Sequence, residues 1–217
     1  MTVAVLIPML TRAHRVAPLL ESLRATSPTA RPVFICSPDD TAVHNAIDTA
    51  GEERITVPGP DPGDYARKIN AGYRHTTEEL MFLGADDLLF HPGWFEAALA
   101  ELRPGIGVVG TNDLGSKRVM AGEHSTHSLV TRAYCDEHGT IDGLGSVLAE
   151  VYPHEFVDDE FVATAKHRGA WAFAFDSHVE HLHPSWGKAP MDPMYAQQAA
   201  RMNTGRRIFR RRQRLWT

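Results

Sequence analysis

The feature that most constrains this chain is a pair of adjacent carboxylates, Asp86 and Asp87, inside the apolar run LMFLGADDLLF at residues 80–90. A short apolar run bounded by glycine is typical of a buried parallel strand, and open α/β sheets bind ligands beyond the carboxyl ends of their strands. Two carboxylates between apolar segments are costly unless a cation, hydrogen bonds or water compensate them. A divalent metal is one explanation for the pair, and capping of the next helix is the other.

Length and composition indicate one globular core, or one core domain with an appended subdomain. The chain has 217 residues, of which 43% are hydrophobic and 23% are charged, as in ordinary soluble domains. No apolar run approaches the roughly 18 residues of a membrane span, and the N-terminal segment is interpreted as a first strand, not as a targeting signal. The two cysteines, Cys36 and Cys135, lie far apart, which favours a reducing, cytoplasmic location and argues against a zinc-thiolate site.

Charge is distributed unevenly along the chain. Residues 201–217 hold seven arginines and no acid, so residues 1–200 carry a formal net charge of −12. We therefore expect a single domain at residues 1–190, divided into halves at 1–110 and 111–190, and a basic tail at 191–217. A frayed solvated tail, a membrane-surface helix, an oligomer contact and nucleic-acid affinity are each compatible with such a tail, and no specific nucleic-acid partner is expected.

Strand and helix patterns alternate through the first half of the chain. Strands are predicted at 3–8, 32–36, 54–57, 80–83 and 106–110, and helices at 16–23, 41–50, 64–75 and 92–102. This alternation predicts a doubly wound α/β sheet. The loop after the first strand, residues 8–12 (PMLTR), contains no glycine, which excludes a Walker loop and a dinucleotide fingerprint.

Polar residues lie near the expected strand tips. Asp39 and Asp40 follow the second strand, where a turn with a helix cap and contact with a ligand are equally good explanations. Lys68 and Asn70 lie in the helix before the Asp86–Asp87 strand and are poor core residues, so either one is a candidate for contact with an anion or a base.

The second half contributes further acids and a group of histidines. Asp158 and Asp159 fall in the first turn of a helix predicted within residues 154–171, where the helix dipole alone explains acidic residues. A strand is predicted at 171–175, and alternation beyond it places His181 and His183 on one face. Neutral imidazoles are good ligands for a divalent metal already held by carboxylates.

The ordered set of motifs resembles the glycosyltransferases of the GT-A fold, most closely the family 2 type. Pro8 with Arg12 resembles the family's opening, Ser37-x-Asp39-x-Thr41 its second-strand element, and Asn70-x-Gly72 followed by LMFLGADDLLF its N-x-G and acidic segments. The match covers about residues 3–110, with a weaker continuation to about 187. It implies a GT-A (Rossmann-like) α/β fold, with a mainly parallel central sheet flanked by helices.

The same resemblance implies a metal-dependent transfer of a sugar from a nucleotide-diphosphate sugar to a glycan, protein or small-molecule acceptor, with Mn²⁺ or Mg²⁺. Asp159 is implied as the general base of an inverting reaction, although a retaining enzyme remains open. The implied metal ligands are Asp87 and a histidine, with His183 favoured over His181. The implied nucleotide-binding residues are Pro8, Arg12, Asp39, Lys68, Asn70 and Asp86.

Because the chain departs from the family pattern at two positions, the identity of the donor's nucleobase is not predicted. The family often has an acid near Ile35 or Cys36, and another near Gly84 or Ala85, and this chain has neither. Three alternatives therefore stand beside transfer: a sugar-phosphate nucleotidyltransferase, a non-catalytic nucleotide-sugar or glycan-binding module, and metal-dependent phosphodiester hydrolysis. The glycine-free loop at residues 8–12 argues against the first of these.

Overall fold

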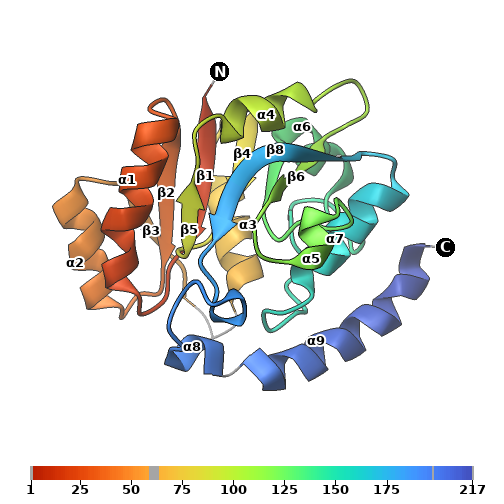
Figure 1. Cartoon of the computed structure of the whole chain (residues 1–217). Coiled ribbons are helices and arrows are strands. Elements are labelled where there is room, and N and C mark those ends of the chain that lie inside the picture. Colours follow the sequence, from red (N-terminus) through yellow and green to blue (C-terminus); the bar gives the residue numbers. More distant parts are fainter. Residues whose placement is uncertain (1, 59–63, 197, 217) are drawn as a thin grey trace.

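A computed structural model describes residues 2–58, 64–196 and 198–216 (Figure 1). Within these residues eight strands form one sheet, in the order β3-β2-β1-β4-β7-β6-β8-β5. The strands are β1 (Val3–Pro8), β2 (Arg31–Cys36), β3 (Arg54–Thr56), β4 (Leu80–Leu83), β5 (Leu88–Phe90), β6 (Val108–Asn112), β7 (Ser128–Thr131) and β8 (Trp171–His181). Strands β1 to β4 pair in parallel, as do β6 and β8, whereas β7 and β5 run antiparallel to their neighbours.

Helices cover both faces of this sheet (Figure 1). They are α1 (Val16–Thr26), α2 (Thr41–Ala50), α3 (Tyr65–His75), α4 (Trp94–Ala100), α5 (Lys117–Met120), α6 (Arg132–His138), α7 (Val157–His167), α8 (Pro193–Ala196) and α9 (Gln198–Arg212). Alternate residues of β1 enter two separate cores, one shared with α1, α2 and α4 and the other with α3, α6 and α7. A strand buried on both faces explains the continuous apolar run VAVLI. The predicted α/β fold, mainly parallel and flanked by helices, is confirmed.

Several strand boundaries differ from the prediction; the strand predicted at 106–110, for example, is β6 at Val108–Asn112. Leu88–Phe90 forms β5, which was not predicted as a strand and which pairs antiparallel with the end of β8. The strand predicted at 171–175 continues to His181 because its second half gains β5 as a partner. Residues 58–64 (PGPDPGD) are expected to form a glycine- and proline-rich loop, and residues 59–63 of that segment lie outside the described residues.

Gly84 explains one departure from the family pattern. Its backbone N–H donates to the Leu6 carbonyl at 2.9 Å, and a Cβ at this position would lie 2.8 Å from that oxygen. No side chain fits so close to a backbone carbonyl without moving it. An acid at position 84 is therefore excluded by the close approach of the β4 end to β1.

The C-terminal residues, expected as a basic tail, form α8 and α9 and pack against the body. Ile208 and Phe209 of α9 contact the core that contains α7. Arg212 donates to both carboxylate oxygens of the buried Glu160, at 2.6 and 2.9 Å. Figure 1 shows α9 running beside α7 along one edge of the molecule. Among the described residues, no helix is long and apolar enough to cross a membrane.

A substitution of Asn70 tests how its side chain stabilises this fold. Its buried amide donates to the Leu148 carbonyl at 2.8 Å and accepts from the backbone N–H groups of Val147 and Leu148 at 2.9 and 3.0 Å. We predict that Asn70→Ala lowers the free energy of unfolding by about 3 kcal/mol, because buried backbone groups lose their partners. Urea denaturation followed by circular dichroism measures the loss.

Asn45→Ala, on the exposed side of α2, is the control and should change the unfolding free energy by less than about 0.5 kcal/mol. An Asn70→Ala variant of normal stability that no longer binds nucleotide would contradict this structural role.

Candidate active site

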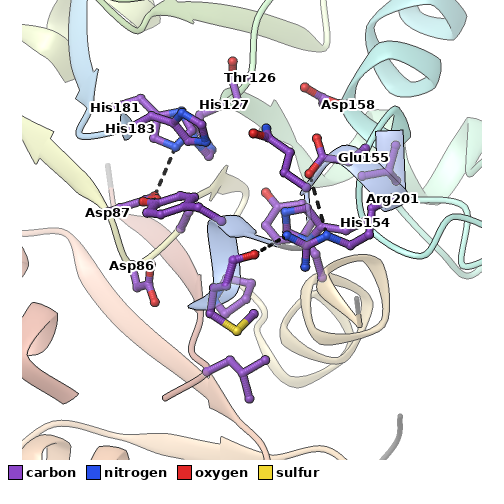
Figure 2. A pocket seen from close by; sticks show the side chains of 18 of the residues that line it. Asp86, Asp87, Thr126, His127, His154, Glu155, Asp158, His181, His183 and Arg201 are labelled. Carbon is purple, nitrogen blue, oxygen red and sulfur yellow. Dashed lines mark hydrogen bonds and ion pairs between the residues drawn. The ribbon is translucent and has the colours of Figure 1, made fainter. Parts of the chain in front are cut away.

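A cavity of about 450 Å³ lies where β1 and β4 end. Its walls come from the loops after β1, β4 and β8, from the start of α7, and from α8 and α9. Figure 2 shows Asp86, Asp87, His181 and His183 on one side, with His154, Glu155, Asp158 and Arg201 on the other. The polar edge expected from the strand tips therefore exists, and segments far apart in sequence enclose it.

Asp86 and Asp87 are both buried, and Arg12 supplies their counter-charge. Arg12 Nη1 lies 2.9 Å from Asp86 Oδ1 and 3.4 Å from Asp87 Oδ2. The same guanidinium binds Asp192 with two further nitrogens, Nε at 2.9 Å and Nη2 at 3.2 Å. Tyr195 donates to Asp87 Oδ2 at 2.5 Å, and its ring lies 4.1 Å from the Arg12 guanidinium carbon. One cation thus ties the strand-tip carboxylates to α8.

The two carboxylates titrate differently. Burial, and then the charge of Asp87, raise the pKa of Asp86 to about 7. Burial also opposes ionisation of Asp87, but the charge of His181 and the hydrogen bond from Tyr195 hold its pKa well below the usual value. Asp87 is therefore the carboxylate that remains ionised and available to a cation near neutral pH.

Three histidines surround Asp87. His181 Nε2 lies 3.3 Å from Asp87 Oδ1, and the His181 ring contacts the rings of His127 and His183 with centroids 5.2 Å apart in each case. Burial and the charge of His181 lower the pKa of both His127 and His183 to about 4, so those two imidazoles are neutral near pH 7. Burial opposes protonation of His181 as well, but the charge of Asp87 raises the pKa of His181.

The donor atoms around Asp87 are of kinds that bind a divalent metal, but among the described residues no three of them lie within 4.8 Å of one another. His181 Nδ1 and His127 Nε2 are buried and have no hydrogen-bond partner, which is costly unless a ligand uses them. Asp87 Oδ1 is buried as well and lies 3.3 Å from His181 Nε2. His183 Nδ1 accepts from the Ser185 N–H at 3.1 Å, so the proton of the neutral ring lies on Nε2. For His183 to ligate through Nε2, its proton would have to move from Nε2 to Nδ1, and the hydrogen bond from the Ser185 N–H would be lost. The Nδ1 of His181 has no hydrogen-bond partner. One nitrogen of each ring is therefore already engaged: Nδ1 of His183 with the Ser185 N–H, and Nε2 of His181 with Asp87.

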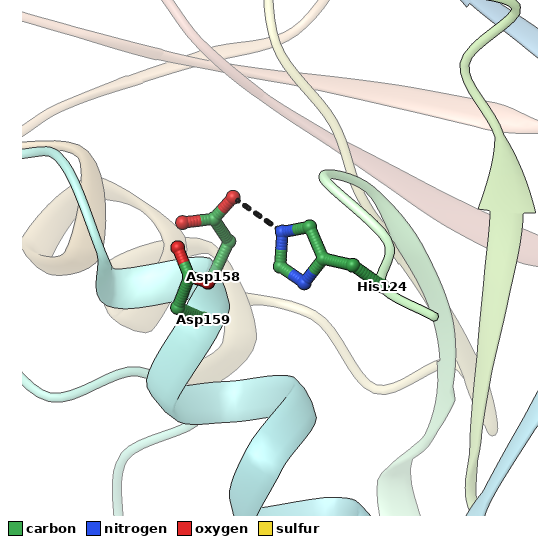
Figure 3. A group of neighbouring side chains, drawn as sticks. All are labelled: His124, Asp158 and Asp159. Carbon is green, nitrogen blue, oxygen red and sulfur yellow. Dashed lines mark hydrogen bonds and ion pairs between the residues drawn. The ribbon is translucent and has the colours of Figure 1, made fainter. Parts of the chain in front are cut away.

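A second group contains His124, Asp158 and Asp159 (Figure 3). Among the described residues, these are the ones that offer three metal-ligating atoms within 4.8 Å of one another. His124 Nε2 lies 3.2 Å from Asp158 Oδ2, and Asp159 Oδ1 accepts from Arg118 at 3.0 Å. Each acid already has a cationic partner, and both lie in the first turn of α7. The group is therefore balanced as it stands.

The two aspartates of α7 face different surroundings. Asp158 lines the cavity, whereas Asp159 is not among the lining residues and is directed to Arg118. Burial disfavours the Asp158 charge, but the hydrogen bond from His124 lowers the pKa of Asp158. Burial and the charge of Asp158 raise the pKa of Asp159. In the structure it is Asp158 that faces the cavity, while the predicted base Asp159 pairs with Arg118.

The predicted nucleotide-binding residues separate into two groups. Pro8, Arg12, Lys68 and Asp86 line the cavity. The Lys68 ammonium is buried, donates to Met9 O and Ser37 Oγ at 2.9 and 2.8 Å, and so joins α3 to the loops after β1 and β2.

Asp39 and Asn70 do not line the cavity. Asp39 is exposed, and it is the neighbouring Asp40 that caps α2 through the Val43 N–H. Asn70 holds residues 147 and 148, as described above.

Sequence reasoning missed His127, Asp192, Tyr195 and Arg201 as cavity-related residues. All except Asp192 line the cavity directly, and Asp192 reaches it through Arg12. The one usable signal was Asp192-Pro193, since an aspartate before proline is typical of a helix start. Asp192 does cap α8, accepting from the N–H groups of Met194 and Tyr195.

No protein-family model matches this chain, and no curated protein matches its sequence. Solved structures do match. The mannosyltransferase PcManGT from Pyrobaculum calidifontis, in complex with GDP-Man and Mn²⁺, has a TM-score of 0.64 at 17% identity over 92% of this chain. This chain spans 60% of that protein's length.

Two other glycosyltransferase structures are similar. Glucosyl-3-phosphoglycerate synthase from Mycobacterium tuberculosis, in complex with Mn²⁺, UDP and glucosyl-3-phosphoglycerate, has a TM-score of 0.60 at 14% identity, covering 92% of this chain and 76% of that chain. S. aureus TarS 1–349 has a TM-score of 0.60 at 12% identity, covering 82% and 59%. This chain therefore has the GT-A fold.

Arg12 provides a test of the electrostatics of the site. We predict that Arg12→Ala lowers the free energy of unfolding by about 3–5 kcal/mol, because it leaves buried carboxylates without their counter-charge. Thermal and urea unfolding measure the change. Arg24→Ala is the control: Arg24 is 57% exposed in its ion pair with Glu52, and its loss should cost less than about 1 kcal/mol. Equal effects of the two changes would contradict the role assigned to Arg12.

Proposed function

We propose that this chain is a metal-dependent glycosyltransferase that moves a sugar from a nucleotide-diphosphate sugar to an acceptor hydroxyl. The observation that carries the proposal is Asp87 at the tip of β4, buried beside His181 and His183 at a cavity of about 450 Å³. The GT-A fold supports it, because two of the similar structures were determined with Mn²⁺ and with GDP-Man or UDP. A hard carboxylate with neutral imidazoles is a donor set that Mn²⁺ or Mg²⁺ accepts.

In this proposal, Asp87 and the two histidines hold the metal. His181 and His183 would each contribute one ring nitrogen beside the Asp87 carboxylate. A divalent cation bound there supplies a Lewis acid against the charge that develops on the departing diphosphate. Arg12 keeps Asp86 and Asp87 in place through the contacts described above.

The nucleotide side of the cavity is formed by Pro8, Met9, Tyr65 and Ala85. These residues offer apolar surface and backbone groups, and the neighbouring acid in the wall, Asp64, is already paired with Lys68 at 3.2 Å. Gly84 has no room for a side chain, as its contact with Leu6 O shows. We therefore propose that backbone groups and packing recognise the nucleobase of the donor. Its identity is not indicated by a carboxylate contact.

The acceptor side contains the general base. Asp158 lines the cavity, remains ionised through its bond with His124, and lies across from Asp87 (Figure 2). A carboxylate so placed accepts the proton of an acceptor hydroxyl as that hydroxyl attacks the anomeric carbon from the face opposite the diphosphate. The reaction would then invert the anomeric configuration.

Metal-dependent release of nucleoside diphosphate tests the reaction. Incubation with Mn²⁺ and a panel of sugar nucleotides should give slow release of the free diphosphate. Asp87→Asn should reduce that release about a hundredfold, because it removes a ligand from the centre that stabilises the leaving group. His181→Ala and His183→Ala should each reduce it as well. Asp39→Asn, at an exposed acid outside the cavity, is the matched control and should leave the rate unchanged.

Failure of every sugar nucleotide to bind in the presence of Mn²⁺ would refute the proposal. Binding without turnover, even with varied acceptors, would instead favour a non-catalytic module of the same fold.

The two α7 aspartates provide a separate test of the base. We expect Asp158→Asn to lower kcat by about 10²–10⁴ with little change in donor affinity, because the variant keeps its shape and loses only the proton acceptor. Asp159→Asn should retain most of the activity. Steady-state kinetics with donor affinity measured in parallel distinguishes the two, and the reverse ranking would restore Asp159 as the base.

A further inference from the structure

Arg201 is a cation in the cavity wall that the proposed chemistry does not use. It lies on α9, its side chain is 12% exposed, and it lines the cavity. Nη2 donates to the Met194 carbonyl at 2.7 Å. Nε and Nη1 are buried and have no hydrogen-bond partner. A guanidinium with two unsatisfied donors is costly in such a position, and a bound anion would remove that cost.

The acids nearby do not balance this charge. Asp158 is bonded to His124, and Asp159 to Arg118. Glu155 Oε1 lies 4.0 Å from Arg201 Nε, at the limit of an ion pair and beyond hydrogen-bond distance. Burial and the charge of Asp158 raise the pKa of Glu155 to about 7, so it is only a partial counter-charge near neutral pH. The positive charge of Arg201 therefore has no close acidic partner among the residues described in this wall.

We propose that Arg201 binds a phosphate or carboxylate group carried by the acceptor, so that the acceptor is an anionic hydroxy compound. This inference rests on the proposed glycosyltransferase function. A planar guanidinium binds such groups through two parallel N–H bonds, and a small rotation of the side chain directs Nε and Nη1 to the ligand.

The place of Arg201 in the cavity indicates that its anion belongs to the acceptor and not to the donor. The diphosphate of the donor belongs beside the metal ligands Asp87, His181 and His183. Figure 2 places Arg201 across the cavity from them, on the side of Asp158, the proposed base. The molecule whose hydroxyl meets Asp158 is therefore the one whose charged group reaches Arg201.

Three small compounds that differ mainly in charge test this inference. Glycerol, D-glycerate and glycerol 3-phosphate all carry hydroxyls, and the last two add a carboxylate or a phosphate. Their binding to the protein loaded with Mn²⁺ and nucleoside diphosphate is measured by calorimetry or ligand-observed NMR. We expect the two anions to bind at least about tenfold more tightly than glycerol.

Variants of α9 identify the residue responsible. Arg201→Ala should remove the preference for anions, at a cost of about tenfold to a hundredfold in their affinity, and leave the affinity for nucleoside diphosphate unchanged. Arg201→Lys should keep part of the preference because it keeps the charge. Arg207→Ala is the control, since Arg207 is exposed on the same helix and does not line the cavity. Thermal unfolding checks that each variant is folded.

The outcomes separate the two proposals. Equal binding of glycerol and the two anions to the unchanged protein would overturn the inference, as would equal losses in the Arg201 and Arg207 variants. Loss of nucleoside diphosphate binding in Arg201→Ala alone would assign Arg201 to the donor and would also overturn it. Absence of nucleotide binding to the unchanged protein refutes the glycosyltransferase function instead, and the anion preference is then measured on the protein without nucleotide.

Discussion

The contact between the Arg12 guanidinium and three aspartates holds the candidate site together. Asp86 and Asp87 are buried at the end of β4, where like charges so close together oppose folding. Arg12 compensates them from the loop after β1, and Asp192 binds the other edge of the same guanidinium. Strand order brings the first two partners together, because β1 and β4 are neighbours in the sheet. The third partner comes from 180 residues further along the chain.

This arrangement makes the C-terminal segment part of the site. Tyr195 reaches Asp87 from α8, and Arg201 enters the same cavity from the start of α9. The far end of α9 is attached separately, through the bonds from Arg212 to Glu160. A segment held at both ends against the body closes the cavity on one side. The basic composition of residues 201–217 therefore serves packing and the cavity wall as well as solvation.

Sequence patterns predicted the frame of the fold because the frame depends on local rules. Helix α2 begins and ends where its cap and apolar spacing indicated, at Thr41 and Ala50. Strand β5 was missed because three residues carry no periodic signal, and it forms only where the end of β8 is available to pair with it. Asn70 illustrates the same limit for a side chain. Its place in an N-x-G motif indicated a ligand contact, while its bonds go to a loop some 77 residues away.

By itself, the sequence determined that Asp86 and Asp87 follow a buried strand, that acids begin α7, and that His181 and His183 lie near the end of the last strand. Those conclusions rest on the order and spacing of residue types, which local geometry converts into positions at a sheet edge. Only the tertiary structure decided that Arg12 and Asp192 meet, that Asp158 and not Asp159 lines the cavity, and that Arg201 turns inward. The physical reason is that these pairings depend on distances between elements far apart in sequence, and on which side of a helix faces the sheet edge.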